Sequence, residues 1–278
     1  MLFGILGPLE CPGRGCAHPP RHQKLLAALL VDGGRAVTVN DLMTAMWDGW
    51  PAATARTQIQ GGVSALRRHF AEAPFARAGR PPRIEYGAVG YTLRLGAHEL
   101  DADVFRARVA QGYAERERGE FAAAAETLRG ALALWRGPAL AGLDGARLRA
   151  RAGRLEESRL TAAETMLRLW WRLGRTAQVL DALPDLVAAY PLSERLIELE
   201  MRALLHAGRR GDALLAYARL RERLADGLGL DPGADLVALH RDILRGRAEP
   251  AAPGRRPVGP RRRATRVRVS PFPVGRSA

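Results

Sequence analysis

Thr54-Ala55-Arg56-Thr57-Gln58-Ile59-Gln60-Gly61-Gly62-Val63-Ser64-Ala65-Leu66-Arg67-Arg68 is the stretch that decides the fold. Its apolar residues Ile59, Val63 and Leu66, continued by Phe70, recur at the spacing of one helix face. The opposite face carries Arg56, Thr57, Gln60, Ser64 and Arg68, with Arg67 at its edge. Guanidinium, amide and hydroxyl groups on one face of a helix suit the major groove of DNA. An ordinary amphipathic surface helix has the same pattern, so the neighbouring elements must decide between the two.

Three elements are predicted ahead of this helix. Residues 1–9 alternate and are rich in Leu, Ile and Phe, which predicts a strand. Residues 22–31 place leucines on one face and predict a helix, which Gly33-Gly34 ends because glycine accepts the left-handed conformation of a helix C-terminus. Thr38 or Asn40 is expected to cap a second helix that extends to Trp47.

A β-hairpin is predicted after the helix. Two short strands, residues 83–86 and 91–95, flank a turn that runs from Gly87 to Gly90. The order of strand, three helices and hairpin indicates a winged helix-turn-helix of the α+β class over residues 1–95. In that architecture the third helix enters the major groove, and the hairpin wing touches the flanking backbone or the minor groove.

Residues 97–246 predict an all-α, tetratricopeptide-like repeat domain, which makes the chain mainly α. Helices are expected from Asp101 and over residues 122–134, 146–173, 177–189 and 212–224. Gly174-Arg175 recurs as Gly208-Arg209 after 34 residues, the tetratricopeptide period, whereas the unit at Gly119 is out of register. Such a degenerate array is suited to contacts with proteins. Its aromatic residues are expected in the core: Trp135, Trp170, Trp171, Tyr190 and Tyr217.

Charge is distributed unevenly along the chain. Residues 1–95 contain 11 basic and 6 acidic residues, residues 96–246 contain 23 and 22, and residues 247–278 contain 9 and 1. The first and last segments therefore suit a polyanionic partner, and the middle segment does not. Residues 247–278 combine prolines with arginines and are expected to form a basic disordered tail, which either adds phosphate contacts or is only a solvated extension.

Nothing in the sequence indicates an enzyme. The six histidines are scattered, and no Cys/His cluster has the spacing of zinc ligands, so no catalytic, metal-binding or cofactor-binding residue is predicted. The acidic pairs Glu156-Glu157 and Glu198/Glu200 are interpreted as surface ion pairs. Cys11 and Cys16 either meet across a hairpin or stay free, and free thiols are expected in a reducing cytoplasm. No apolar run is long enough for a membrane helix, so we expect a cytoplasmic, nucleoid-associated protein with no membrane partner.

Both predicted domains resemble one protein family. The resemblance in the first domain is carried by residues 3–10, 34–38, 42–47, 54–56, 63–68 and 90–91. In the second domain it is carried by Leu134-Trp135-Arg136-Gly137-Pro138, Tyr190-Pro191-Leu192-Ser193-Glu194-Arg195 and Gly229-Leu230-Asp231-Pro232-Gly233. The chain resembles the Streptomyces antibiotic regulatory proteins, which join an OmpR/PhoB-type winged helix to a bacterial transcriptional activation domain.

The resemblance implies a sequence-specific transcriptional activator of a secondary-metabolism pathway. Its expected partners are double-stranded promoter DNA with direct repeats, the RNA polymerase holoenzyme and further copies of itself on the DNA. The expected DNA-binding residues are Arg56, Thr57, Gln60, Ser64, Arg67 and Arg68 of the third helix and Tyr91, Thr92 and Arg94 of the wing.

The alternative is a helical-repeat adaptor whose first domain has lost the ability to read DNA. The family usually has larger residues where this chain has Gly61-Gly62, and glycine inside a helix costs roughly 1 kcal/mol relative to alanine.

Overall fold

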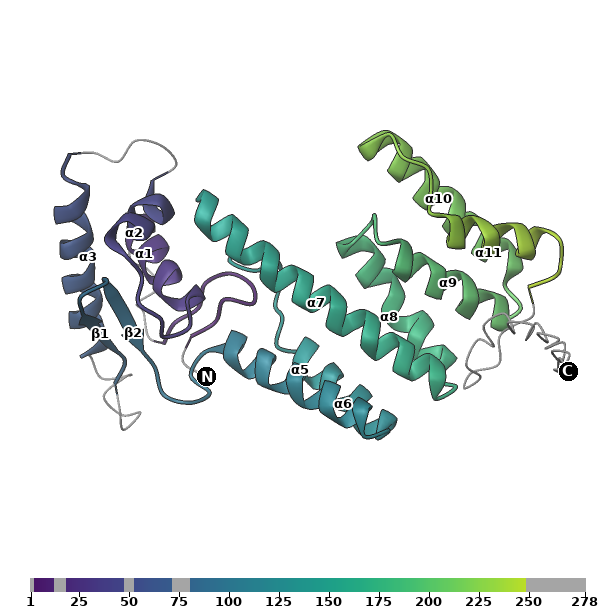
Figure 1. The fold of residues 1–278 in the computed structure, drawn as a ribbon, viewed down its shortest axis with the longest axis horizontal. Helices are drawn as coiled ribbons and strands as arrows, with labels where there is room; N and C mark the ends of the chain where they lie inside the picture. Colours follow the sequence, from purple (N-terminus) through teal and green to yellow (C-terminus); the bar gives the residue numbers. More distant parts are fainter. Residues whose placement is uncertain (1–2, 13–18, 48–52, 72–80, 249–278) are drawn as a thin grey trace, which may run out of the picture.

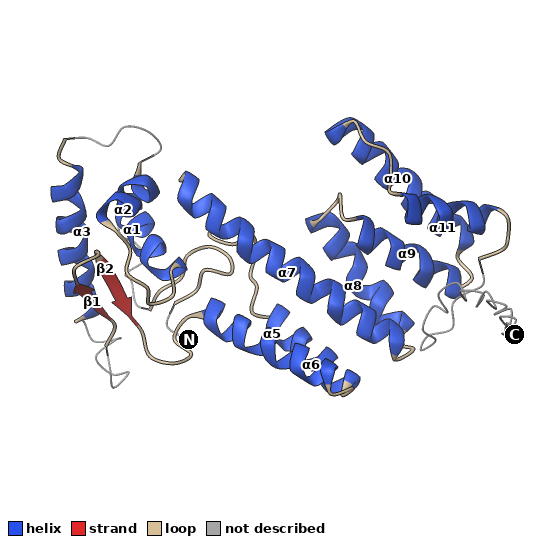
Figure 2. Cartoon of the chain, in the orientation of Figure 1, coloured by secondary structure: helices blue, strands red, loops and turns tan. Residues whose placement is uncertain are grey.

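The computed structural model describes residues 3–12, 19–47, 53–71 and 81–248. Helices dominate this part of the chain, and its only strands form one antiparallel hairpin (Figure 2). In chain order the elements are α1 (Pro20–Val31), α2 (Val39–Met46), α3 (Ala55–Phe70), β1 (Arg83–Tyr86), β2 (Tyr91–Arg94), α5 (Asp101–Glu117), α6 (Phe121–Leu132), α7 (Ala146–Arg172), α8 (Thr176–Ala189), α9 (Glu194–His206), α10 (Arg210–Leu228) and α11 (Ala234–Leu244). A winged helix followed by an all-helical domain is confirmed.

Local signals explain the boundaries of the first helices. The Thr38 hydroxyl accepts a hydrogen bond of 3.0 Å from the Asp41 N–H and so caps α2, which the sequence predicted. The predicted stop after α1 is confirmed, since Gly33 and Gly34 have φ angles of 56° and 77°. The predicted hairpin is confirmed as well, with Ile84 opposite Leu93. These signals depend on neighbours in the chain, which is why the sequence shows them.

The strand predicted over residues 1–9 is wrong. In its described part, Phe3 and Gly4 form only isolated bridges, to Leu100 and Glu10. The physical reason is the Asp101 carboxylate, which accepts hydrogen bonds of 2.9 and 3.0 Å from the N–H groups of Ile5 and Leu6. Because a side chain occupies these donors, the segment cannot extend a sheet through them.

The same segment joins the winged helix to the helical domain. The Ile5 and Leu6 carbonyls accept hydrogen bonds from the N–H groups of Leu140 and Arg136, at 3.1 and 2.8 Å. The Arg136 guanidinium pairs with Asp101 at 2.9 Å and also with Glu10. One hydrophobic core consequently runs without interruption from Phe3 through the winged helix and into α9.

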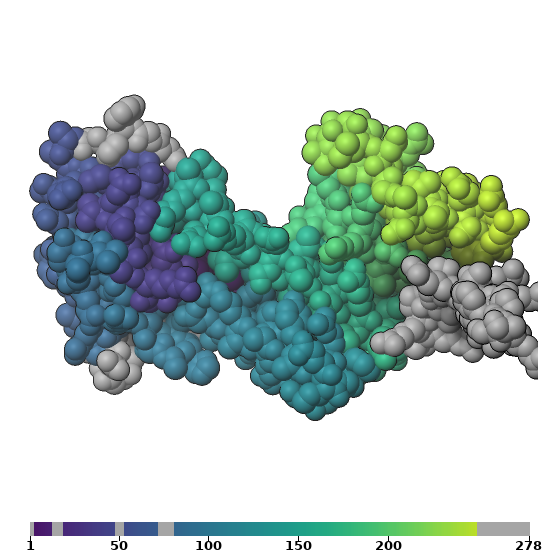
Figure 3. Space-filling model, viewed as in Figure 1, coloured from purple at the N-terminus to yellow at the C-terminus, as the bar shows by residue number. Residues whose placement is uncertain are grey.

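The helical domain is organised around α7, which at 27 residues is the longest helix among the described residues. One end of α7 lies against α1 and α2, and its other end leads into α8 and α9 (Figure 1). Helices α9, α10 and α11 enclose a second, smaller core, in which Met201, Ala216 and Leu220 are completely buried. This part turns away from the axis of α7, so α10 stands apart from the beginning of α7 and the molecule has a V-shaped notch (Figure 3).

The repeated Gly-Arg pairs, at residues 174–175 and 208–209, lie in two equivalent turns between helices. Gly174 and Gly208 both have φ of 75°, and α8 and α10 begin two residues after them. Of the aromatic residues predicted in the core, Trp135, Trp170 and Tyr217 are buried, and Trp171 and Tyr190 are partly buried and pack against the core.

Two expectations about the polar residues need correction. Glu156 does more than form a surface ion pair, because it accepts hydrogen bonds from the Ala139 N–H and the Tyr190 hydroxyl, at 2.7 and 2.8 Å. Cys11 is in a disulfide rather than free, and Cys16, the only other cysteine in the sequence, lies outside the described residues.

Asp101→Ala is expected to destabilise the whole protein. It removes the acceptor of two backbone N–H groups and one partner of Arg136, so the free energy of unfolding should fall by about 3–5 kcal/mol. Chemical denaturation measures this change. Asp212→Ala is the matched control, since Asp212 forms an exposed pair with Arg209, and its removal should cost less than about 1 kcal/mol. Equal losses from the two variants would contradict the role assigned to Asp101.

Candidate nucleic-acid interface

Helix α3 buries one face against the winged-helix core and exposes the other. Ile59 and Leu66 are completely buried, and Val63 and Phe70 are each 2% exposed. The exposed face carries all six residues that the sequence predicted for this helix: Arg56, Thr57, Gln60, Ser64, Arg67 and Arg68. Since α3 contains no acidic residue, this face presents only cationic and neutral polar groups to solvent.

Arg56 and Arg68 are available for a ligand. Within the part of the chain that the structure describes, neither guanidinium has a hydrogen bond or ion pair, and both side chains belong to exposed residues. The Ser64 hydroxyl donates to the Gln60 carbonyl at 2.9 Å, which leaves its lone pairs free to accept. The face therefore offers two unpaired cations on either side of a hydroxyl and an amide.

Arg67 has a partner within the protein. Its Nε and Nη2 donate to the Ile84 carbonyl at 3.0 and 2.7 Å. This bidentate contact ties the last turn of α3 to β1, so Arg67 fixes the position of the wing relative to the helix. Its contact with DNA stays a prediction, and Nε and Nη2 are already used within the protein.

The three residues of the wing that were predicted to bind DNA differ in their exposure to solvent. Tyr91 and Thr92 are each only 7% exposed, because β2 turns them toward neighbouring elements. Arg94 is exposed but pairs with Glu85 at 3.0 Å and donates to the Gly34 carbonyl at 3.3 Å. Their contacts with DNA stay predictions, and the burial of Tyr91 and Thr92 leaves them little surface with which to make any.

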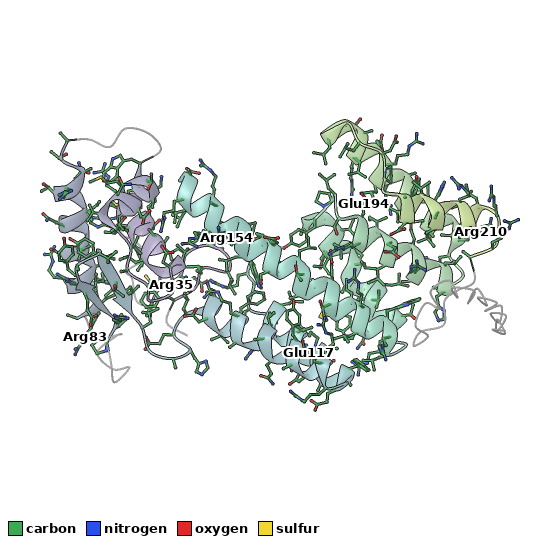
Figure 4. The ribbon with its side chains drawn as sticks, viewed as in Figure 1. Arg35, Arg83, Glu117, Arg154, Glu194 and Arg210 are labelled. Carbon is green, nitrogen blue, oxygen red and sulfur yellow. The ribbon has the colours of Figure 1, made fainter. Side chains whose placement is uncertain are left out.

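Other residues occupy the exposed positions around the helix and the wing. Tyr86 and Val89, at the tip of the hairpin, are 66% and 64% exposed. Arg83 begins β1 beside the last turn of α3 (Figure 4). Arg21, on α1, donates to the Gln58 amide oxygen of α3. Arg83 is exposed at the start of β1, whereas Arg21 is brought to α3 by the packing of α1.

The two glycines of α3 have different environments. A Cβ atom at Gly62 would lie 2.7 Å from Leu25 Cδ2, so glycine is what lets α3 approach α1 at this point. A Cβ atom at Gly61 would have no neighbour within 4 Å. Gly62 is thus a packing residue of the core, and Gly61 is an exposed position without a side chain.

The described residues contain no group of three or more His, Cys, Asp or Glu side chains that could hold a metal ion. None of the helices over these residues is both long and apolar enough to cross a membrane.

Comparison with known proteins identifies the family. A model of the bacterial transcriptional activator domain matches residues 100–244. The regulatory protein DnrI of Streptomyces peucetius is 35% identical over 253 residues, which cover 88% of this chain and 92% of DnrI. The transcriptional regulator RedD of Streptomyces coelicolor is 38% identical over 248 residues, or 87% of this chain and 70% of RedD. The chain belongs to the Streptomyces antibiotic regulatory proteins. Members of this family are transcriptional regulators and not enzymes.

Other relatives of this antibiotic regulatory protein are longer than the chain. AfsR of Streptomyces coelicolor is 37% identical over 256 residues, which cover 90% of this chain and 25% of AfsR. A solved structure of Mycobacterium tuberculosis EmbR, in complex with a low-affinity phosphopeptide, superposes with a TM-score of 0.76 at 33% identity. That superposition covers 89% of this chain and 65% of EmbR. The arrangement of both domains is thus shared with a solved regulator.

Alanine substitutions at the two glycines should have opposite effects on stability. Gly61→Ala should stabilise the protein by about 0.5–1 kcal/mol, because alanine restricts the unfolded chain and meets nothing in the folded one. Gly62→Ala should destabilise it by about 1–3 kcal/mol through overpacking against Leu25. Thermal and chemical denaturation of the two variants test the difference. A stabilising Gly62→Ala substitution would show that α3 does not need this close approach.

Proposed function

We propose that this regulator is a sequence-specific DNA-binding activator that controls a secondary-metabolism pathway. In this proposal it binds direct repeats in a promoter, associates with further copies on the DNA and recruits RNA polymerase. The observation that carries the proposal is the exposed face of α3, with two unpaired arginines, no acidic residue and a hydroxyl and an amide between them. The winged-helix fold supports it, and so does the similarity to RedD and EmbR, which are transcriptional regulators.

Each group on the α3 face has a distinct expected role. Arg56 lies near the start of the helix, where phosphates of the flanking backbone are expected. Gln60 and Ser64 lie at its centre, where base edges are read, and a bidentate amide selects adenine. Arg68 is placed for a phosphate or for a guanine edge. Phosphate contacts position the protein on the duplex, while base contacts select the sequence.

The structure removes part of the support for the alternative function, a protein-interaction adaptor that does not bind DNA. It relied on the Gly61-Gly62 pair, and Gly62 is accounted for by its contact with Leu25. Only Gly61 remains as a departure on the exposed face, and it leaves the arginines of α3 unaffected.

Removal of the free arginines should weaken DNA binding and its salt dependence together. Arg56→Ala and Arg68→Ala should each lower affinity for the regulated promoter and reduce the slope of log K against log salt by about 1 for each phosphate contact that is lost. Fluorescence anisotropy over a salt series measures both quantities. Arg129→Ala, in an exposed pair with Glu126 on α6, is the control and should change neither quantity.

Competition with unrelated DNA tests the sequence specificity. Unlabelled promoter fragment should displace the labelled promoter at far lower concentration than an unrelated fragment of equal length. Equal displacement by the two competitors would rule out sequence-specific binding. Unchanged binding after Arg56→Ala and Arg68→Ala would rule out α3 as the reading helix.

A further inference from the structure

Two arginines in the first two turns of α7 form ion pairs with the winged helix. Arg147 donates from Nη2 to Asp32 and from Nη1 to Asp41, both at 2.8 Å. Arg151 donates to the other oxygen of Asp32. The arginines belong to the activation domain and the aspartates to the winged helix, more than 100 residues earlier in the chain. We call these four residues the α7 clamp.

The clamp is built on a buried carboxylate. The side chain of Asp32 is 6% exposed, and those of Arg147 and Arg151 are 22% and 33% exposed. Asp32 caps the end of α1, and Asp41 lies in the first turn of α2. A single guanidinium, that of Arg147, therefore fixes the end of one helix against the start of the next. A buried carboxylate that loses its cationic partners is strongly unfavourable, so the contact is not incidental.

Backbone contacts place α7 directly on α2. A Cβ atom at Gly145 would lie 2.7 Å from the Ala45 carbonyl oxygen, so no side chain fits between the start of α7 and α2. Leu148 of α7 and Leu42 of α2 are both completely buried in the shared core. Helices α1 and α2 pack against α3 as well as against α7, and they lie between α3 and the start of α7 (Figure 1).

We infer that Arg147 and Arg151 are positioning residues for DNA binding, and that the start of α7 contributes to the DNA affinity of the winged helix. They act through Asp32 and Asp41, which hold α1 and α2, and these helices set the position of α3. This inference rests on the proposed function. It assigns to the activation domain a contribution to DNA affinity that involves no contact with DNA. Because coupling between sites is reciprocal, bound DNA must in turn stabilise the clamp.

The first test replaces both clamp arginines in the full chain. Arg147→Gln with Arg151→Gln should weaken promoter binding about tenfold, a typical size for coupled sites, and should leave the salt slope unchanged because no phosphate contact is lost. The matched control is Arg129→Gln with Arg175→Gln, since these two arginines also share one carboxylate, that of Glu126, but lie in the helical domain. The control should bind as the unaltered chain does.

The second test uses the unaltered chain, so its result does not depend on whether a variant folds. Hydrogen exchange is measured for amides 146–152 of α7 and, as a reference, for amides of α10, with and without promoter DNA. By reciprocity, DNA should slow exchange in the first turns of α7 and leave α10 unchanged. A purely structural clamp would give no response to DNA.

The outcomes separate this inference from the proposed function. Unchanged affinity of the clamp variant, or unchanged exchange in α7, overturns the inference while leaving DNA binding intact. A salt slope lowered by about 2 in the clamp variant shows direct phosphate contacts and overturns the positioning role. If the unaltered chain and the control variant both fail to bind the promoter, the proposed function is wrong, and this inference is wrong with it.

Discussion

The buried carboxylate of Asp101 is the interaction on which the rest of the structure depends. Its side chain is 4% exposed, and it binds two backbone N–H groups from 96 and 95 residues earlier in the chain and one guanidinium from 35 residues later. Burial of a charge at this depth is tolerable only because charge-assisted hydrogen bonds replace those made with water. The result is that the first residues of the chain, the start of α5 and the loop after α6 share one anchoring point.

Helix α7 extends this arrangement over the length of the protein. At a rise of 1.5 Å per residue, its 27 residues span about 40 Å. The α7 clamp holds one end of this helix. Near its middle, Glu156 accepts hydrogen bonds from the Ala139 N–H and the Tyr190 hydroxyl. Burial, together with Glu156, raises the pKa of Tyr190, so this hydroxyl stays protonated as a donor. Further along, Glu164 accepts from Ser193 at 3.3 Å. These contacts fasten the winged helix, the loop that contains Ala139 and the connection between α8 and α9 to the same helix.

Features set by neighbouring residues could be predicted from the sequence. The cap at Thr38, the amphipathic α3, the hairpin and the two equivalent glycine turns all follow from spacing or local chemistry. Features set by distant residues could not. The Asp101 carboxylate withdraws the first segment from a sheet, and β2 buries Tyr91 and Thr92. The Ile84 carbonyl engages Arg67, and α7 adds its arginines to the winged helix. In each case the decisive partner lies elsewhere in the chain, where periodicity carries no information about it.

The continuous core limits where the domains of two such regulators can be joined to make a chimaera. A chimaera joined near residue 96 would follow the apparent division of the sequence but cut through a single packed interior. The transplanted winged helix would carry Asp32 without its guanidiniums, and the N–H groups of Ile5 and Leu6 would lose the Asp101 carboxylate. A junction after α7, at the turn around Gly174, keeps the pairs of Asp32 and Asp101, although it divides the core that α7 shares with α8 and α9. A portable unit that keeps both carboxylates paired must therefore include α5, α6 and α7 together with the winged helix.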